Sequence, residues 1–334
     1  MNLKLLNTEI QQFISDNLNS DISKLILRGS PFKDVSIKEI VEQIEAKKKC
    51  EIKLTTWFSA QNIYYPNKLN IEQTSSEITS KYKSELLSGN HLIDITGGFG
   101  VDTFYFSKHF KNVTHCEIDY KLSNIAHHNF EALKVSNIDC INANGIDYLK
   151  SNNKTYDWIF VDPSRRHNQK GKVFYLKDCL PNLVEDLDIL LNYSDNILIK
   201  ASPMLDISVG ISELKYVKEI NIIALNNDVK ELLFIIKKGY KSNIKISTIN
   251  FTQKEGKQEF SYLKNDETEA EATYSNLKTF LYEPNAAILK SGAFNLISLK
   301  LHIDKLHVNT HLYTSNTLID FPGRKFKVIK TIPY

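Results

Sequence analysis

Residues 157–166, DWIFVDPSRR, form the segment of this chain whose residue types most directly suggest chemistry. An apolar run, typical of a buried β-strand, ends in an acid and a proline. Pro163 would fix the backbone just beyond the strand, so that Asp162 and nearby carbonyls can face a bound molecule. Two of the four arginines of this lysine-rich chain follow. Guanidinium groups grip phosphate bidentately or stack on bases, so Arg165 and Arg166 are candidates for substrate contact rather than a solvated basic turn.

A second segment, residues 92–102 (LIDITGGFGVD), joins an apolar run to a glycine cluster and a predicted helix. Glycine lets the backbone turn sharply and approach a ligand, and the helix N-terminus suits a carboxylate. A dinucleotide site requires G-x-G-x-x-G, but here the spacing is G-G-x-G, and Asp102 would repel a pyrophosphate. Asp94 would hold an ammonium group of the ligand, directly or through water. The other predicted contacts are Thr96, Gly97, Gly98 and Gly100, although the cluster is also compatible with an ordinary tight turn.

Two later strand ends carry further candidates. Glu117 follows the first strand by about 20 residues, the span of one βαβ unit, where an acid can bind both ribose hydroxyls. Asp119 is the competing candidate for that role, and Ile118 would lie flat against an adenine. Asn144 follows the next strand, and its amide oxygen can accept a hydrogen bond from the adenine amino group.

The elements between these segments predict the sheet that would position them. From His91 onward, short apolar runs alternate with helical stretches, which implies a parallel sheet with helices on both faces. The last two runs are joined by Asn226-Asn227-Asp228, so they form an antiparallel hairpin. The seven predicted strands are 91–96, 113–118, 138–141, 157–161, 195–201, 216–225 and 230–237. Seven strands with the last one reversed are the methyltransferase variant of the doubly wound, Rossmann-like α/β sheet.

Two further domains are expected to flank this sheet. The first 80 residues show the apolar spacing of amphipathic helices, interrupted by Gly29-Ser30-Pro31. A polar stretch at 252–273 marks a boundary, and the tail combines a predicted helix, 285–298, with strand-like runs at 306–314 and 325–332. We therefore expect an N-terminal helical domain (1–80), a Rossmann-like domain (81–240) and a small C-terminal α+β domain (241–334). The last domain ends abruptly on an apolar strand, which predicts that it is shortened.

The composition says more about the cellular location of the protein than about its binding partner. The 334 residues are 42% hydrophobic and 24% charged, and the formal net charge is only +3, so charge alone does not demand a nucleic acid. No apolar stretch is long enough to span a bilayer, and the N-terminus lacks a secretory pattern. The cysteines, Cys50, Cys116, Cys140 and Cys179, form no C-x-x-C pair for zinc or a redox disulfide. We expect buried thiols, no metal site, no membrane association and a cytoplasmic location.

Together these segments resemble class I methyltransferases, and more narrowly the bacterial THUMP-like methyltransferases. The matching segments are 72–77 (EQTSSE), 94–102 (DITGGFGVD), 162–166 (DPSRR) and 200–206 (KASPMLD). The resemblance implies S-adenosylmethionine as the cofactor, with Gln73 helping to close its pocket. It also implies a ferredoxin-like piece at about 280–318, followed by a THUMP-like domain that in this group extends beyond the position of Tyr334. Ser164 and Arg165 replace the Pro-Tyr pair of amino methyltransferases, so specificity for an exocyclic amine of adenine or guanine is not carried over.

At two places in the chain, the sequence is compatible with more than one role for the side chain. Ser75 or Ser76 either caps the following helix, expected at about 75–87, or contributes to the pocket. Lys200 either lines the mouth of the same site or extends its ammonium into solvent at the edge of the sheet.

The resulting hypothesis is an S-adenosylmethionine-dependent methyltransferase that acts on a base in structured tRNA or rRNA. Asp162 would orient the attacking nitrogen or accept its proton, and Arg165 and Arg166 would hold a phosphate or the flipped base. The strand ends at Thr96, Glu117 and Asp162 should then converge on one ligand. The alternative is the same fold methylating a protein or a small molecule, while the glycine spacing opposes a nicotinamide enzyme. No pattern indicates the methylated atom or the oligomeric state.

Overall fold

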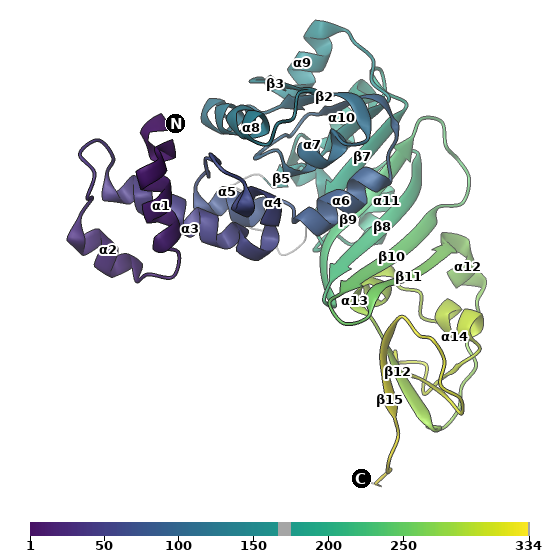
Figure 1. Cartoon of the computed structure of the whole chain (residues 1–334). Helices are drawn as coiled ribbons and strands as arrows, with labels where there is room; N and C mark the ends of the chain where they lie inside the picture. Colours follow the sequence, from purple (N-terminus) through teal and green to yellow (C-terminus); the bar gives the residue numbers. More distant parts are fainter. Residues whose placement is uncertain (166–174, 333–334) are drawn as a thin grey trace. The chain divides into compact units, whose positions relative to one another are not determined.

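The computed structural model of the chain describes residues 1–165 and 175–332 (Figure 1). Its contacts divide the chain into two compact units. The first consists of residues 1–161 with 192–194, and the second of residues 162–191 with 195–334. The domain boundaries expected at residues 80 and 240 remain predictions.

The first unit begins with short helices, as the apolar spacing predicted. They are η1 (Leu3–Leu6), α1 (Thr8–Asp16), α2 (Ile22–Arg28), α3 (Ile37–Lys53), α4 (Thr55–Ser59) and α5 (Lys68–Gln73). A capping box between Ser36 and Glu39 starts α3, and Gly29 in the left-handed region ends α2. The apolar faces of α1, α2 and α3 bury one cluster that includes Ile14, Leu25 and Ile40.

The rest of the first unit is a parallel sheet with helices. The strands are β1 (Gly89–Asp94), β2 (Phe110–Cys116), β3 (Ile138–Ile141) and β4 (Trp158–Val161), in the order β4-β1-β2-β3. The helices are α6 (Glu77–Glu85), α7 (Val101–Phe106), α8 (Tyr120–Ala132) and α9 (Gly145–Asn152). All strand pairs are parallel, so the carboxyl ends of the strands share one edge. Of the predicted cofactor residues, Thr96, Glu117 and Asn144 follow these strand ends along the chain, whereas Gln73 lies at the end of α5 and Asp162 belongs to the second unit.

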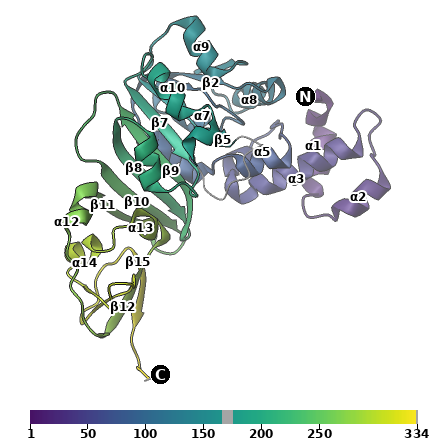
Figure 2. The same cartoon turned by 180° about the vertical axis from the view of Figure 1, so that it is seen from behind.

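The second unit holds a mixed sheet in the order β7-β9-β8-β10-β11 (Figure 2). Its first elements are β5 (Ser164–Arg165), η2 (Leu176–Asp178), β6 (Cys179–Leu180), α10 (Leu183–Leu190), β7 (Asn196–Ala201) and α11 (Ile207–Glu213). The remaining strands are β8 (Val217–Leu225), β9 (Asp228–Lys237), β10 (Lys245–Thr252) and β11 (Gly256–Leu263). Strand β9 runs antiparallel to both β7 and β8. The predicted hairpin is therefore confirmed, with Asn226 and Asn227 both at positive φ in its turn.

Strands β10 and β11 were not expected. Strand β10 pairs in parallel with β8 over seven residues, so the sheet continues past residue 240. The polar stretch that indicated a boundary, 252–273, contains all of β11 and the turn before it. Strand β10 was overlooked because it alternates apolar with polar residues, and Thr248 and Asn250 are buried with their side chains hydrogen-bonded to β11.

The C-terminal part of the second unit is a small α+β arrangement, as predicted. Its elements are α12 (Lys264–Glu269), β12 (Phe280–Pro284), α13 (Ala286–Ser291), α14 (Leu296–Leu301), β13 (Asp304–Lys305), β14 (Tyr313–Ser315) and β15 (Gly323–Lys327). The strands form a sheet in the order β13-β14-β12-β15. The single helix expected at 285–298 is wrong, because Gly292 at φ 78° ends α13 and a second helix follows.

The four cysteines are free thiols, and Cys50, Cys116 and Cys179 are buried. Burial raises the pKa of Cys50 to about 12, which keeps this thiol protonated and unreactive. Within residues 1–165 and 175–332, no helix combines the length and apolarity needed to cross a membrane.

Candidate cofactor and catalytic sites

The glycine loop is fixed in the first unit by hydrogen bonds to the end of the neighbouring strand. The Gly97 amide donates to the Cys116 carbonyl over 2.8 Å, and the Gly98 amide donates to Oε2 of Glu117 over 2.8 Å. Gly98 and Gly100 have φ values of 56° and 86°, which other residues rarely adopt. A Cβ on Gly100 would also lie 2.4 Å from the ring of Phe130. The loop therefore depends on glycine for both its turns and its packing.

Glu117 is the acid that faces this loop. Its Oε1 accepts the Asp119 amide over 2.7 Å, and its carboxylate is half-buried. The competing candidate, Asp119, caps α8 by accepting the amides of Lys121 and Leu122. Glu117 as the ribose ligand remains a prediction, because each of the two acids accepts backbone amides. Ile118 stands beside it and is 70% exposed, as expected of an apolar surface that an adenine would cover.

Asp94 is oriented toward the loop rather than toward solvent. It is 1% exposed, and its carboxylate accepts the Thr96 amide over 3.0 Å and the Thr103 hydroxyl over 2.7 Å. It thus ties the end of β1 to the first turn of α7. The predicted contact between Asp94 and a ligand ammonium group remains a prediction.

Asn144 serves as the N-cap of α9. Its amide oxygen accepts the amides of Ile146 and Asp147 over 3.0 and 3.3 Å. Both lone pairs of this oxygen are therefore engaged within α9, although the predicted hydrogen bond from the adenine amino group requires this same oxygen as acceptor. A contact of Asn144 with an adenine remains a prediction. The next residue, Gly145, packs on β1, where an added Cβ would lie 2.4 Å from the Cβ of Ile95.

A buried ion pair behind the loop was missed from the sequence. The Lys83 ammonium is fully buried, 3.2 Å from Oδ1 of Asp102 and 3.0 Å from the Ser75 hydroxyl. The hydroxyls of Ser75 and Ser80 donate to Asp102 over 2.7 and 2.6 Å. Asp102 is thus neutralised within the first unit. The sequence signal for this pair is weak, because Lys83 lies on a helix face of small polar residues, Thr79, Ser80 and Ser84.

The same network shows which of the two serines, Ser75 or Ser76, caps the following helix. Ser76 caps α6 by accepting the Thr79 amide, whereas Ser75 binds Asp102 in α7. Gln73 is exposed at the end of α5, two residues before Ser75. Glu77, in the first turn of α6, accepts the Thr56 amide and the Tyr105 hydroxyl. The segment that contains Gln73 is therefore anchored to α7, the helix that begins directly after Gly100.

His115 lies beneath the glycine loop. It is fully buried, and neither ring nitrogen has a hydrogen-bond partner among the described residues. Burial lowers the pKa of His115 to about 4, so the imidazole is neutral at physiological pH. A Cβ on Gly97 would approach the ring to 2.3 Å.

In the second unit, Asp162 forms an ion pair with Lys200. The Lys200 ammonium lies 2.5 Å from Oδ2 of Asp162, and the two side chains are 12% and 35% exposed, respectively. Lys200 therefore turns toward Asp162 rather than extending into solvent, and its place at the mouth of a ligand site remains a prediction. The backbone of Arg165 belongs to β5, which pairs with β6. The Arg165 side chain and all of Arg166 lie outside the described part of the chain.

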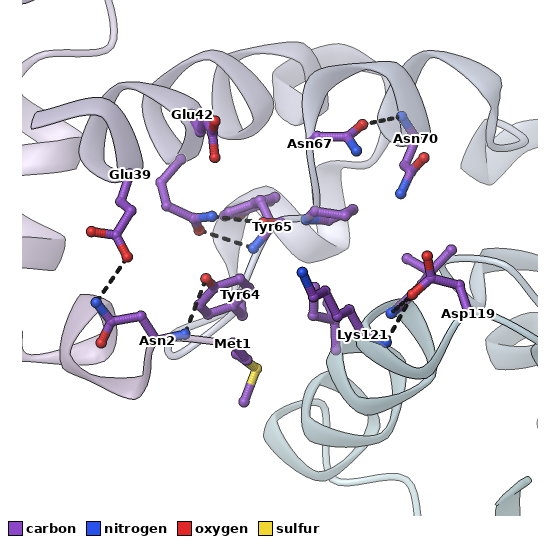
Figure 3. A pocket seen from close by; sticks show the side chains of 14 residues that line it. Met1, Asn2, Glu39, Glu42, Tyr64, Tyr65, Asn67, Asn70, Asp119 and Lys121 are labelled. Atoms are coloured by element: carbon purple, nitrogen blue, oxygen red, sulfur yellow. Dashed lines mark hydrogen bonds between the residues drawn. The ribbon is translucent and has the colours of Figure 1, made fainter. Parts of the chain in front are cut away.

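A pocket of about 590 Å³ lies in the first unit between the N-terminal helices and α8 (Figure 3). Figure 3 shows Glu39, Glu42 and Tyr64 on the side of the N-terminal helices, and Asp119 and Lys121 on α8. Three carboxylates and one lysine line the pocket, so the pocket carries net negative charge and does not suit a phosphate backbone. None of the predicted cofactor residues lines this pocket.

Comparisons with known proteins agree with this architecture. A crystal structure from Porphyromonas gingivalis W83, of a protein provisionally described as a methyltransferase, matches with a TM-score of 0.85 and 28% identity. The match covers 100% of this chain and 84% of that one. The fold is that of a class I methyltransferase. The family model of a ferredoxin-like domain matches residues 280–322, so the ferredoxin-like piece is also confirmed.

A curated relative from Mycoplasma mobile, described as an uncharacterized RNA methyltransferase, is 27% identical over 137 residues. The matched part is 39% of this chain and 37% of the relative, so the chain spans little more than a third of that protein's length. A THUMP-like domain beyond the ferredoxin-like piece remains a prediction.

Proposed function

We propose that this chain is an S-adenosylmethionine-dependent methyltransferase that methylates a base in structured RNA, tRNA or rRNA. The observation that carries the proposal is the hydrogen bond from the Gly98 amide to Glu117, with Ile118 exposed beside it. It joins a loop suited to the methionine carboxylate to an acid suited to the ribose and an apolar surface suited to the adenine. The methyltransferase fold shared with the P. gingivalis protein supports the same assignment.

In this proposal the loop residues Thr96, Gly97, Gly98 and Gly100 lie against the amino-acid part of the cofactor, while their own amides stay hydrogen-bonded within the protein. Asp94 holds the loop in place, and its contact with the ligand ammonium runs through water, because its carboxylate is buried. Asn144 meets the adenine, and Gln73 closes the pocket from the segment anchored through Ser75. When bound, S-adenosylmethionine supplies an activated methyl group, so the protein chiefly aligns the acceptor with it.

The residues proposed to bind the substrate belong to the second unit. Asp162 follows β4 directly in the chain and orients the acceptor nitrogen, while Arg165 and Arg166 hold a phosphate or the flipped base. The lysines at 325, 327 and 330 in and after β15 contact the RNA backbone. The RNA methyltransferase description of the M. mobile relative supports an RNA substrate. A cytoplasmic location follows from that substrate.

The proposal is tested in two steps with the purified full chain. Binding of S-adenosylhomocysteine should raise the melting temperature and NAD should not, because only a ligand of the native state stabilises it. Transfer of labelled methyl from S-adenosylmethionine is then followed in a cell extract, with and without ribonuclease treatment. Label in protein or in small molecules, but not in RNA, would replace the RNA substrate with the alternative acceptors. Stabilisation by NAD alone would overturn the methyltransferase assignment.

A further inference from the structure

The ion pair of Asp162 and Lys200 places a hydrogen-bond acceptor next to a donor. Lys200 is held in β7, which pairs with β9 at Leu233, and Asp162 is followed by the fixed backbone of Pro163. The carboxylate and the ammonium lie 2.5 Å apart, and Asp162 is the more accessible of the two. A carboxylate offers about four acceptor positions and an ammonium three donors, so the pair presents an acceptor beside a donor.

We propose that this pair selects a lactam as the methyl acceptor, that is, a ring N–H beside a carbonyl. The N1–H and O6 of guanine and the N3–H and O4 of uracil have this chemistry. The ring N–H would donate to Asp162 and the neighbouring carbonyl would accept from Lys200. This inference rests on the proposed function and names the class of atom that receives the methyl group.

The charge of Lys200 separates a lactam from an exocyclic amine. Methylation of a neutral amine builds positive charge on the nitrogen and no negative charge beside it, so the ammonium of Lys200 would have no developing charge to stabilise. A lactam instead loses its ring proton, and negative charge spreads to the carbonyl oxygen. An ammonium placed at that oxygen stabilises the charge as it develops.

The step balances with these two side chains. The ring N–H bond breaks and its proton passes to the Asp162 carboxylate. The nitrogen electron pair forms the bond to the methyl carbon, while the bond from that carbon to sulfur breaks and its pair stays on sulfur. The products are the N-methylated lactam and S-adenosylhomocysteine, and Asp162 returns its proton to water. No oxidant or further reactant is needed.

The first test identifies the methylated nucleoside. The full chain is incubated with labelled S-adenosylmethionine and RNA from a strain that lacks this protein, and the RNA is digested to nucleosides. We expect label in 1-methylguanosine or 3-methyluridine. Label in an exocyclic N-methyl group, on carbon or on ribose would overturn the lactam inference and leave an RNA methyltransferase. Absence of label from RNA would overturn the proposed function itself and the inference with it.

The second test uses variants of the pair. Lys200→Ala should lower kcat by about 100- to 1000-fold, the usual effect of removing one donor from a developing oxyanion. The affinity for S-adenosylhomocysteine should not change. Lys200→Arg should restore part of the rate, since it keeps the positive charge. Lys215→Ala is the matched control, because Lys215 pairs with Asp188 over 2.7 Å at an exposed position. An unchanged kcat in Lys200→Ala, with the same nucleoside formed, would overturn the inference.

Discussion

The buried ion pair between Lys83 and Asp102 should be a principal determinant of the stability of the first unit. Lys83→Met removes the ammonium but keeps most of the apolar stem, and it leaves the Asp102 carboxylate buried with the Ser75 and Ser80 hydroxyls. Removal of one partner of a buried pair costs about 3 to 5 kcal/mol. Because the two serine hydroxyls still satisfy the carboxylate, we expect the lower end, about 3 kcal/mol. At roughly 2 °C for each kcal/mol, the melting temperature should fall by about 6 °C.

A double-mutant cycle with Asp102→Asn separates the pair from packing. The double variant no longer contains an unpaired buried charge, so it should be more stable than the sum of the single effects predicts, by about 1 to 3 kcal/mol. Lys81→Met is the matched control, because Lys81 is exposed on the same helix. Calorimetry of all four proteins with and without S-adenosylhomocysteine gives the cycle and the ligand shift together. Strict additivity, or a Lys83→Met protein as stable as the parent, would refute this account of the network.

Three further outcomes are expected at the glycine loop. Gly97→Ala should weaken binding of S-adenosylhomocysteine, measured by calorimetry, because the new Cβ would meet the His115 ring at 2.3 Å; Gly239→Ala, in an exposed turn with open space, should leave binding unchanged. Glu117→Ala should raise the KM for S-adenosylmethionine by about tenfold or more while kcat changes less, since it removes a charged hydrogen bond to the ribose. His115 has its pKa lowered from 6.5 to about 4 in the native state, so stability should be constant above pH 6.5 and fall as the pH drops toward 4. In His115→Phe this part of the decline in urea-unfolding free energy should disappear, and a wild-type slope in that variant would contradict the assignment.

Much of the first unit could be predicted because its signals are local. The strands β1 to β4 are short apolar runs, and the glycine loop and Glu117 stand at their ends at the spacing of a βαβ unit. The hairpin of β8 and β9 could also be predicted from the sequence, since Asn226 and Asn227 suit the positive φ values of a tight turn. In these places residue type and backbone geometry point to the same structure.

The remainder depends on contacts between segments far apart in the chain. Strand β10 buries polar side chains that only its partner β11 satisfies, so its own sequence indicated a boundary. The role of Asp102 could not be read from its position in the loop, because Lys83 neutralises it from another helix. The pairing of Lys200 with Asp162 likewise joins two strand ends that lie 38 residues apart.

The acids near the glycine loop share a property that bears on cofactor affinity. Asp94 and Glu117 each accept at least one backbone amide from the loop or from the turn next to it, and Asp119 holds the first turn of α8. Ordering of a loop on binding normally subtracts from affinity, and a loop that is already ordered avoids that cost. Glu117 would then contribute to binding twice, through the ribose and through the loop amide that it accepts, whereas Asp94 and Asp119 contribute through the backbone that they fix. Substitution of Asp94 by Asn should consequently weaken cofactor binding even though its buried carboxylate does not touch the ligand directly.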